Sequence, residues 1–347
     1  GPTVLWKSRD PAGAMSVPYA DKEVAVFNTI SDARVLAFDA RSGAKWWEVQ
    51  LLLPRDMRGR GLPPGRLVGK GEVVVVPAWD LYGLDRKTGR IRWKLAPSDD
   101  FPGAGVALGE DGHLYSTGHY LYRIDPAGGT VLWRADLGEQ PFSPVERGGV
   151  VYVGTRGIIP GSSGALGAGH AAAVEAATGR VLWKTAIPAP EDRALGGLTG
   201  AGAVTSDLFV VSSPNGRVYG LDRQTGRVRW ETKGSGPYDA GVVVVGDVAV
   251  TAGDAGSIDG FDLATGRPRW KVAIGGSVSD PLAAQGNTVF AVNGRLWAVT
   301  ASGEVLWRHD AGESVPYSTG ARPQDDNLYI GTSYGRDIGF FALRVPG

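Results

Sequence analysis

The chain has 347 residues with 36 basic and 36 acidic side chains, so its formal net charge is zero. This balance gives no electrostatic basis for binding nucleic acid, which requires a basic surface. No apolar run approaches the length of a membrane-spanning helix, and the absence of cysteine excludes disulfides, thiolate metal sites and cysteine nucleophiles.

The first residues, Gly1-Pro2, look like the remnant that a tag-removing protease leaves, and we interpret residues 3–347 as one domain. A recognisable strand pattern begins almost at once, at Leu5-Trp6. This abrupt start favours a domain trimmed from a longer protein over a mature chain that has lost a leader peptide.

A short motif recurs along the chain, with a Gly four residues before a Trp. The seven pairs are Gly43–Trp47, Gly89–Trp93, Gly129–Trp133, Gly179–Trp183, Gly226–Trp230, Gly266–Trp270 and Gly303–Trp307. An acid precedes the Gly by four residues in every copy except the last, and two residues before it a small residue usually leaves room for a neighbouring indole. In the copy at 221–230, Asp222 can hydrogen-bond the turn backbone and Gly226 can adopt a positive φ. Each copy therefore predicts two antiparallel strands joined by a tight turn.

The number of copies and their spacing indicate the fold. Spacings of about 40–50 residues are typical of one four-stranded propeller blade. An eighth Trp, Trp6, has no turn before it, while Phe341-Ala342-Leu343 at the other end has the pattern of the strand that should precede one. We therefore predict an all-β, eight-bladed β-propeller of four-stranded antiparallel blades, with the last blade closed by the N-terminal strand. The predicted structural, docking tryptophans are Trp6, Trp47, Trp93, Trp133, Trp183, Trp230, Trp270 and Trp307.

Three insertions fall on one face of the predicted propeller. Strand parity places residues 51–66, 156–170 and 188–197 opposite the Thr-Gly turns, on what we call the top face. Arg55, Arg58, Arg60 and Arg66 in the first insertion can bind a carboxylate or phosphate, or can remain solvated beside local acids such as Asp56. Trp79 and His119 lie in further top loops, where each can contact a ligand or simply pack.

The segments that begin the inner strands should surround the top mouth of the central channel. The residues expected to meet a ligand there are Tyr19, Phe142, Tyr238, Asp239, Asp280 and Tyr317. Tyrosine offers stacking area and a polar tip, which suits a small ligand or a peptide. The alternative is that these rings plug the channel and pack against each other.

The small residue, Asp, Thr-Gly and Trp at these offsets resemble the pyrroloquinoline-quinone (PQQ) repeat over essentially the whole chain. The resemblance implies that each Trp docks between adjacent blades. It leaves three functions open. One is an extracytoplasmic sensor or interaction domain of a larger bacterial protein, such as a receptor-type Ser/Thr kinase. The second is a scaffold lipoprotein of the outer-membrane β-barrel assembly type, which would need a lipidated N-terminal cysteine. The third is a PQQ-dependent dehydrogenase with calcium and a catalytic Asp.

Of these we favour a non-catalytic propeller whose partner is a small molecule, a peptide or a protein on the top face. No kinase motif lies in the chain. We expect neither a metal nor PQQ, because the arginines that the sequence places on the top face belong to a loop and not to inner strands. This preference depends on fold analogy, which is a weak basis for function.

Overall fold

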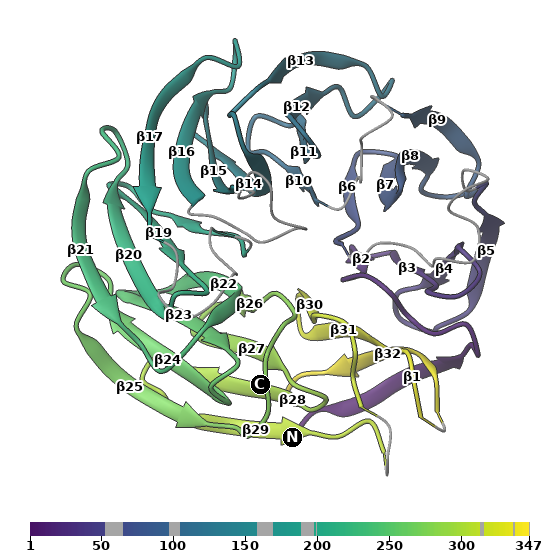
Figure 1. The fold of residues 1–347 in the computed structure, drawn as a ribbon. Coiled ribbons are helices and arrows are strands. Elements are labelled where there is room, and N and C mark those ends of the chain that lie inside the picture. The colour runs from purple at the N-terminus through teal and green to yellow at the C-terminus, as the bar shows by residue number, and fades with distance from the viewer. Residues whose placement is uncertain are drawn as a thin grey trace.

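The computed structural model describes residues 1–52, 65–96, 105–157, 169–188, 198, 200–312, 316–335 and 337–346. These residues form eight four-stranded antiparallel sheets around a central axis (Figure 1). In seven sheets the strands follow one another in chain order, from the channel outward. The predicted eight-bladed β-propeller is confirmed.

The first four blades follow the N-terminal strand. Blade 1 comprises β2 (Tyr19–Ala20), β3 (Val24–Asn28), β4 (Arg34–Asp39) and β5 (Lys45–Gln50). Blade 2 comprises β6 (Val68–Lys70), β7 (Val73–Ala78), β8 (Asp80–Asp85) and β9 (Ile91–Leu95). Blade 3 comprises β10 (Gly105–Leu108), β11 (Leu114–Thr117), β12 (Leu121–Ile124) and β13 (Val131–Ala135). Blade 4 comprises β14 (Gln140–Arg147), β15 (Val150–Arg156), β16 (Gly169–Glu175) and β17 (Val181–Ile187).

The remaining blades complete the ring. Blade 5 comprises β18 (Ala203–Val204), β19 (Leu208–Ser212), β20 (Arg217–Asp222) and β21 (Val228–Lys233). Blade 6 comprises β22 (Tyr238–Val245), β23 (Val248–Gly253), β24 (Ser257–Asp262) and β25 (Pro268–Ala273). Blade 7 comprises β26 (Ala283–Gln285), β27 (Thr288–Val292), β28 (Leu296–Thr300) and β29 (Val305–His309). Blade 8 comprises β30 (Arg322–Gln324), β31 (Asn327–Thr332), β32 (Gly339–Arg344) and β1 (Thr3–Arg9).

The N-terminal strand closes the ring, as predicted. β1 pairs antiparallel with β32, and Trp6 lies opposite Ala342 in this pairing. Figure 1 shows β1 beside β32, with the strand at the beginning of the chain forming the outer edge of the final blade. Both ends of the chain are thereby held in one sheet, which leaves no blade incomplete.

The turn between the two outer strands has the geometry that its sequence predicts. In blade 5 the carboxylate of Asp222 accepts hydrogen bonds from the backbone N–H of Gln224 at 3.0 Å and of Thr225 at 2.9 Å. Gly226 has a φ of 72°, which an L side chain adopts only with strain. Arg229 on β21 pairs with Asp222, and this ion pair helps lower the pKa of Asp222 to about 2.

The docking role of the tryptophans is visible at each blade boundary. The indole N–H of Trp230 donates to the Leu263 carbonyl of blade 6 at 3.1 Å, and its ring lies against Gly266. The same hydrogen bond to the next blade joins Trp6 to Ala40, Trp47 to Arg86, Trp93 to Pro126, Trp133 to Ala176, Trp183 to Arg223 and Trp270 to Ala301. Trp307 packs in the cluster of blades 7 and 8 that also contains Val345, beside the C-terminus.

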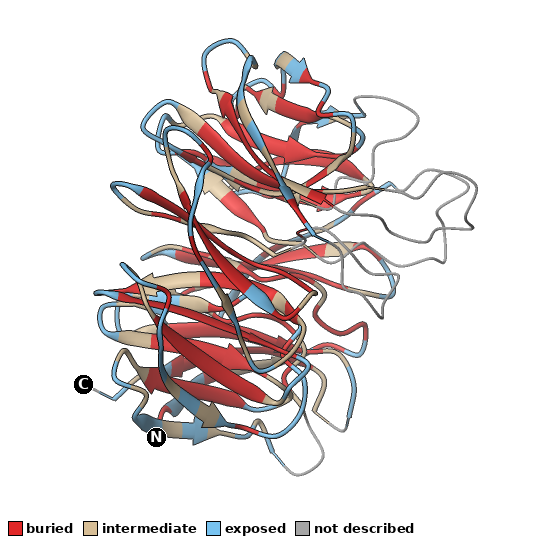
Figure 2. Cartoon of the chain, turned by 60° about the vertical axis from the view of Figure 1, so that its left-hand side comes forward, coloured by how far each residue is buried: buried red, intermediate tan, exposed pale blue. Residues whose placement is uncertain are grey.

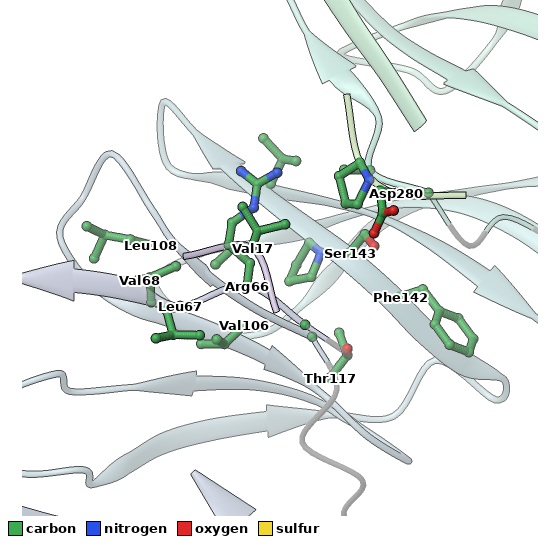
Figure 3. Close-up of a pocket in the computed structure, with 18 of the residues that line it drawn as sticks. Val17, Arg66, Leu67, Val68, Val106, Leu108, Thr117, Phe142, Ser143 and Asp280 are labelled. Atoms are coloured by element: carbon green, nitrogen blue, oxygen red, sulfur yellow. The ribbon is translucent and has the colours of Figure 1, made fainter. Parts of the chain in front are cut away.

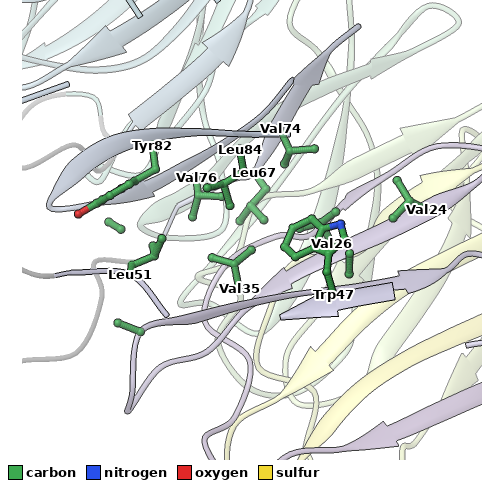
Figure 4. Close-up of a cluster of buried hydrophobic side chains, with 13 residues drawn as sticks. Val24, Val26, Val35, Trp47, Leu51, Leu67, Val74, Val76, Tyr82 and Leu84 are labelled. Carbon is green, nitrogen blue, oxygen red and sulfur yellow. The ribbon is translucent and has the colours of Figure 1, made fainter. Parts of the chain in front are cut away.

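Small residues on the third strand make room for the indole of the same blade. A Cβ on Gly220 would overlap the ring of Trp230, which lies opposite it across the hairpin. Between blades, valines and leucines fill the space around each indole, and Figure 4 shows Trp47 of blade 1 in such a layer with Val74 and Val76 of blade 2. Burial is greatest in the second and third strands of each blade, while outer strands alternate between buried and exposed positions (Figure 2).

Candidate functional site

A cavity of about 740 Å³ lies on the axis, at the ends where the inner strands begin. Every blade contributes at least one residue to its wall. In blade order these include Tyr19, Arg66, Val106, Phe142, Ala201, Asp239, Asp280 and Arg322. The cavity therefore opens on the top face, to which the connections between successive blades also belong.

Much of the cavity wall is apolar. Leu67 and Val68 of blade 2, Val106 of blade 3 and Val17 of blade 1 gather on one side of it (Figure 3). Val17 forms a parallel bridge with Arg66, which ties the start of blade 2 to blade 1. An apolar wall with a few polar groups is typical of sites for small organic ligands.

Tyr19 lines the cavity as expected, but its polar tip is already engaged. Its hydroxyl donates a hydrogen bond to Asp21 at 2.8 Å, and Asp21 in turn pairs with Arg86 at 2.7 Å. Burial and the bond to Asp21 raise the pKa of Tyr19, so this phenol stays protonated at neutral pH. Its ring packs directly on Gly69, where a Cβ would overlap it. Tyr19 therefore contributes to the cavity wall but supplies no free acid or base, because its hydroxyl is bonded to Asp21.

Phe142 and Asp239 also lie where the sequence analysis expects them. The guanidinium of Arg156 lies 4.7 Å from the centre of the Phe142 ring, within range for a cation–π contact. Burial lowers the pKa of Arg156, and the charge of Asp239 partly offsets that effect. Phe142 and Asp239 line the cavity, and Arg156 lies behind them as the cation that interacts with both.

Asp280 is an acidic residue of the cavity whose pKa is strongly raised. Burial alone raises its pKa to about 6. Within the described part of the chain, no positive side chain is close enough to counteract this burial. Asp280 therefore changes its charge between mildly acidic and neutral pH.

Arg66 and Arg322 form the positive side of the cavity. Both residues line the cavity, burial lowers the pKa of both, and the charge of Arg322 lowers the pKa of Arg66 further. The Nε of Arg322 is buried without an acceptor among the described residues. Arginine nevertheless remains charged in proteins, because its intrinsic pKa is above 12.

Two expected mouth residues lie elsewhere, which corrects the sequence analysis. Tyr238 and Tyr317 are each 1% exposed and do not line the cavity. The Tyr238 hydroxyl donates to the buried carboxylate of Asp259, and the Tyr317 hydroxyl lies 2.9 Å from Nδ1 of His309. Both rings fill the space between neighbouring blades, so they belong to the core and not to the mouth.

The reason for this difference is strand register. Tyr19 lies opposite Val26 on the next strand, and Arg322 lies at the equivalent position of blade 8, opposite Tyr329. Tyr317 precedes Arg322 by five residues, although its sequence context, Ser-Val-Pro-Tyr, is the same as that of Tyr19. The likeness of these two segments in sequence therefore does not reflect equivalent places in the blades.

Two of the expected loop contacts, Trp79 and His119, do not line the cavity. Trp79 is half-buried at the tip of the β7–β8 hairpin with a φ of 61°, and it packs against the core between blades 1 and 2. His119 is exposed, with its ring 6.4 Å from that of Tyr120. Arg55, Arg58 and Arg60 lie outside the described residues.

The sequence analysis does not identify Arg322 or Arg156 as site residues, and it includes Arg66 only as one of the arginines of the first insertion. A sequence signal for Arg322 existed, because a charged residue occupies the first position of an inner strand where other blades carry Val68 or Ala283. That signal can be interpreted only once the strand register is known, because the register defines which position begins each inner strand.

A second polar cluster, also unforeseen, lies where β14, β15 and β16 end on the top face. Glu139 accepts hydrogen bonds from Thr155 and, at 2.8 Å, pairs with Nδ1 of His170. Lys184 lies 3.7 Å from the same carboxylate. These contacts join strands of one blade on either side of residues 158–168, and they give the cluster a structural role.

The lining fits a quinone cofactor poorly. PQQ is a flat, multiply charged anion that is held by stacking and by several convergent donors. The aromatic residues of the described lining are Tyr19, which packs on Gly69, and Phe142, whose ring is covered by Arg156. Asp239 and Asp280 would repel a multiply charged anion on the axis. Among the described residues, no group of three or more His, Cys, Asp or Glu side chains is placed to hold a metal ion.

Comparisons with known proteins place this architecture among quinoprotein-type propellers. A family model described as outer membrane protein assembly factor BamB matches residues 3–101, 80–239 and 233–343. The serine/threonine-protein kinase AfsK of Streptomyces coelicolor is 31% identical over 165 residues, which cover 46% of this chain and 18% of the kinase. The 1-butanol dehydrogenase (quinone) of Thauera butanivorans is 28% identical over 138 residues, 33% of this chain and 22% of the enzyme. The chain thus spans about a fifth of the length of the curated relatives that it matches.

The structural comparison supports the same fold. The crystal structure of BamB from Moraxella catarrhalis superposes with a TM-score of 0.55 at 18% identity, over 95% of this chain and 83% of BamB. Over its described residues, the structure contains no helix whose length and hydropathy would let it cross a bilayer.

Proposed function

Since the chain belongs to the family described as outer membrane protein assembly factor BamB, we propose that it is a binding propeller without catalytic activity of its own. The observation that carries this proposal is the cavity on the top face, to which all eight blades contribute. Its wall is largely apolar and carries a few charged side chains, among them Arg66, Arg322, Asp239 and Asp280. Such a wall can hold and orient a small molecule or a peptide side chain.

The experiment that tests this proposal is a search for quinoprotein activity. We expect that titration with PQQ and calcium gives no tight binding, and that a dye-linked assay with alcohols gives no turnover. The basis is the poor fit of the lining to a flat, multiply charged anion. Sub-micromolar PQQ binding accompanied by alcohol oxidation would show that the chain is an enzyme and would overturn the proposal.

We further propose that the propeller is the extracytoplasmic sensor or interaction domain of a larger bacterial protein, such as a receptor-type Ser/Thr kinase. The similarity to AfsK supports this role, because the name of that relative states a serine/threonine kinase and the match covers nearly half of this chain. Sequencing the parent reading frame tests it. A kinase domain and a membrane span ahead of residue 1 are expected, and a free-standing propeller gene would contradict the role.

A scaffold role in outer-membrane protein assembly is the second candidate, favoured by the family match and by the shared fold. It predicts a lipidated cysteine shortly before the propeller in the parent protein. It also predicts that the purified propeller captures a membrane-assembly protein and has no requirement for a small ligand. The reading frame that tests the sensor role therefore separates the two candidates as well.

A further inference from the structure

The positive side of the cavity brings together arginines from blades that are not adjacent. Arg66 precedes β6 of blade 2, and Arg322 begins β30 of blade 8. Blade 1 separates them and contributes Tyr19, whose pKa is affected by the charge of Arg322. Arg66 and Arg322 line the same cavity, and the charge of Arg322 contributes to lowering the pKa of Arg66.

These two cations have no carboxylate partner in the described part of the chain. The ion pairs formed by described residues include most other arginines of the blades, for example Arg86, Arg229 and Arg269, but neither Arg66 nor Arg322. The Nε of Arg322 also lacks an acceptor there. Like charges in an apolar wall without counter-charges are unfavourable, and an anion between them would relieve both the repulsion and the unsatisfied donor.

The acids of the cavity limit which anion fits. Asp239 of blade 6 and Asp280 of blade 7 also line the cavity, and Asp280 has no cation close enough to lower its pKa. A ligand with negative charge at both ends would meet these acids. Leu67, Val68 and Val106 of blades 2 and 3 form an apolar part of the same wall, which favours an apolar body.

We propose that Arg66 and Arg322 form an anion subsite that binds the carboxylate of a small monocarboxylic acid, with the apolar body of that acid against blades 2 and 3. Guanidinium groups bind carboxylates through paired, charge-assisted hydrogen bonds, which suits this role. The inference rests on the proposed binding function and adds the chemical class of the ligand. An amino acid satisfies the same requirement, because its ammonium group can face the acids of the cavity.

The test is calorimetric titration of the purified chain at low ionic strength with hexanoate, phenylacetate, leucine and inorganic phosphate. We expect the carboxylates to bind and phosphate to bind more weakly or not at all. Arg66→Gln and Arg322→Gln should each weaken carboxylate binding by about tenfold or more, since each removes a charged partner. Arg66→Lys should have an intermediate effect, because it keeps the charge and loses the paired donors.

Two controls distinguish a binding role from a structural one. Arg229→Gln removes an arginine whose partner, Asp222, lies on the turn face, and it should leave carboxylate binding unchanged. The melting temperatures of Arg66→Gln and Arg322→Gln should equal or exceed that of the parent, because each variant removes an unpaired cation from an apolar wall. A large loss of stability in both would instead assign the arginines a structural role.

Three results would overturn the inference: no carboxylate binds, binding survives both glutamine variants, or phosphate binds more tightly than every carboxylate. The proposed binding function fails on different evidence, namely PQQ-dependent turnover. If a neutral apolar ligand binds and Phe142→Ala abolishes that binding, the propeller remains a binding domain and the anion subsite is wrong.

Discussion

The indole nitrogen of Trp230 donates a hydrogen bond to the carbonyl of Leu263, which follows it by 33 residues and belongs to the next blade. Seven of the docking tryptophans make this bond, so the boundary between blades is built the same way around most of the ring. Each indole ties the outer strand of one blade to the turn of the next.

The first prediction concerns this docking. Trp230→Ala removes a buried side chain and its hydrogen bond, and should lower the free energy of unfolding by about 3–5 kcal/mol. Trp79→Ala should cost much less, because Trp79 is only half-buried on the top face. Urea denaturation of both variants measures the difference. Equal losses would show that the docking set is misassigned.

The second prediction concerns the turn that receives the indole. Gly266 and Gly246 have φ values of 72° and 60°, so an alanine at either position costs about 1–2 kcal/mol in backbone strain. Gly246 has no neighbour within 4 Å of an added Cβ, whereas a Cβ on Gly266 would overlap Trp230. Gly266→Ala should therefore be clearly more destabilising than Gly246→Ala in the same denaturation experiment. If the two alanine variants lose equal stability, the close approach of Trp230 to this turn has no energetic importance.

The fold could be predicted from the sequence because the residues that determine it act locally and recur in each repeat. Asp222, Gly226 and Trp230 act within one hairpin or at one boundary, and their spacing recurs in nearly every blade. The closure of the ring by the N-terminal strand could be predicted as well, because the strands of Trp6 and Ala342 each supply half of one missing hairpin.

The residues that line the cavity could be predicted only in part, because strand register decides which side chains point into it. Tyr19 and Tyr317 share the context Ser-Val-Pro-Tyr, yet Tyr19 pairs with Val26 inside the sheet and Tyr317 lies five residues before β30 begins its pairing. Sequence likeness alone could not separate these cases. The same ambiguity hid Arg322, which occupies the position of Tyr19 in its own blade.

The third prediction follows from the burial of Tyr238 and Tyr317. The double change Tyr238→Ala with Tyr317→Ala should lower the melting temperature strongly, because it empties two core positions and leaves Asp259 without its tyrosine donor. Binding of carboxylates, measured below the lowered melting point, should be retained. Loss of binding at an unchanged melting temperature would show instead that both rings lie at the mouth of the channel.

The fourth prediction concerns pH. The pKa of Asp280 is raised from 3.8 to about 6 in the folded protein, so the folded state binds this proton more tightly than the unfolded state does. The contribution of Asp280 to stability is therefore most favourable below pH 4 and declines as the pH rises to about 6. Asp280→Asn should increase stability at pH 7.5, by an amount on the order of 2 kcal/mol, and have little effect at pH 4.

Chemical denaturation at these two pH values measures this effect. Asp247→Asn is a suitable control. Asp247 is exposed and pairs with Arg269, and the pKa of Asp247 is lowered and not raised. A pH-independent difference between Asp280→Asn and the parent would show that burial does not hold the proton of Asp280.

The most direct test of the proposed anion subsite is a crystal structure of the chain with the tightest-binding carboxylate of the titration series. We expect one ligand in the axial cavity, with its carboxylate between the guanidiniums of Arg66 and Arg322 and its apolar body against Val68 and Val106. Specific density for the ligand on the opposite face, at the Thr-Gly turns near Lys87 and Gln224, with an empty cavity would contradict the proposed subsite.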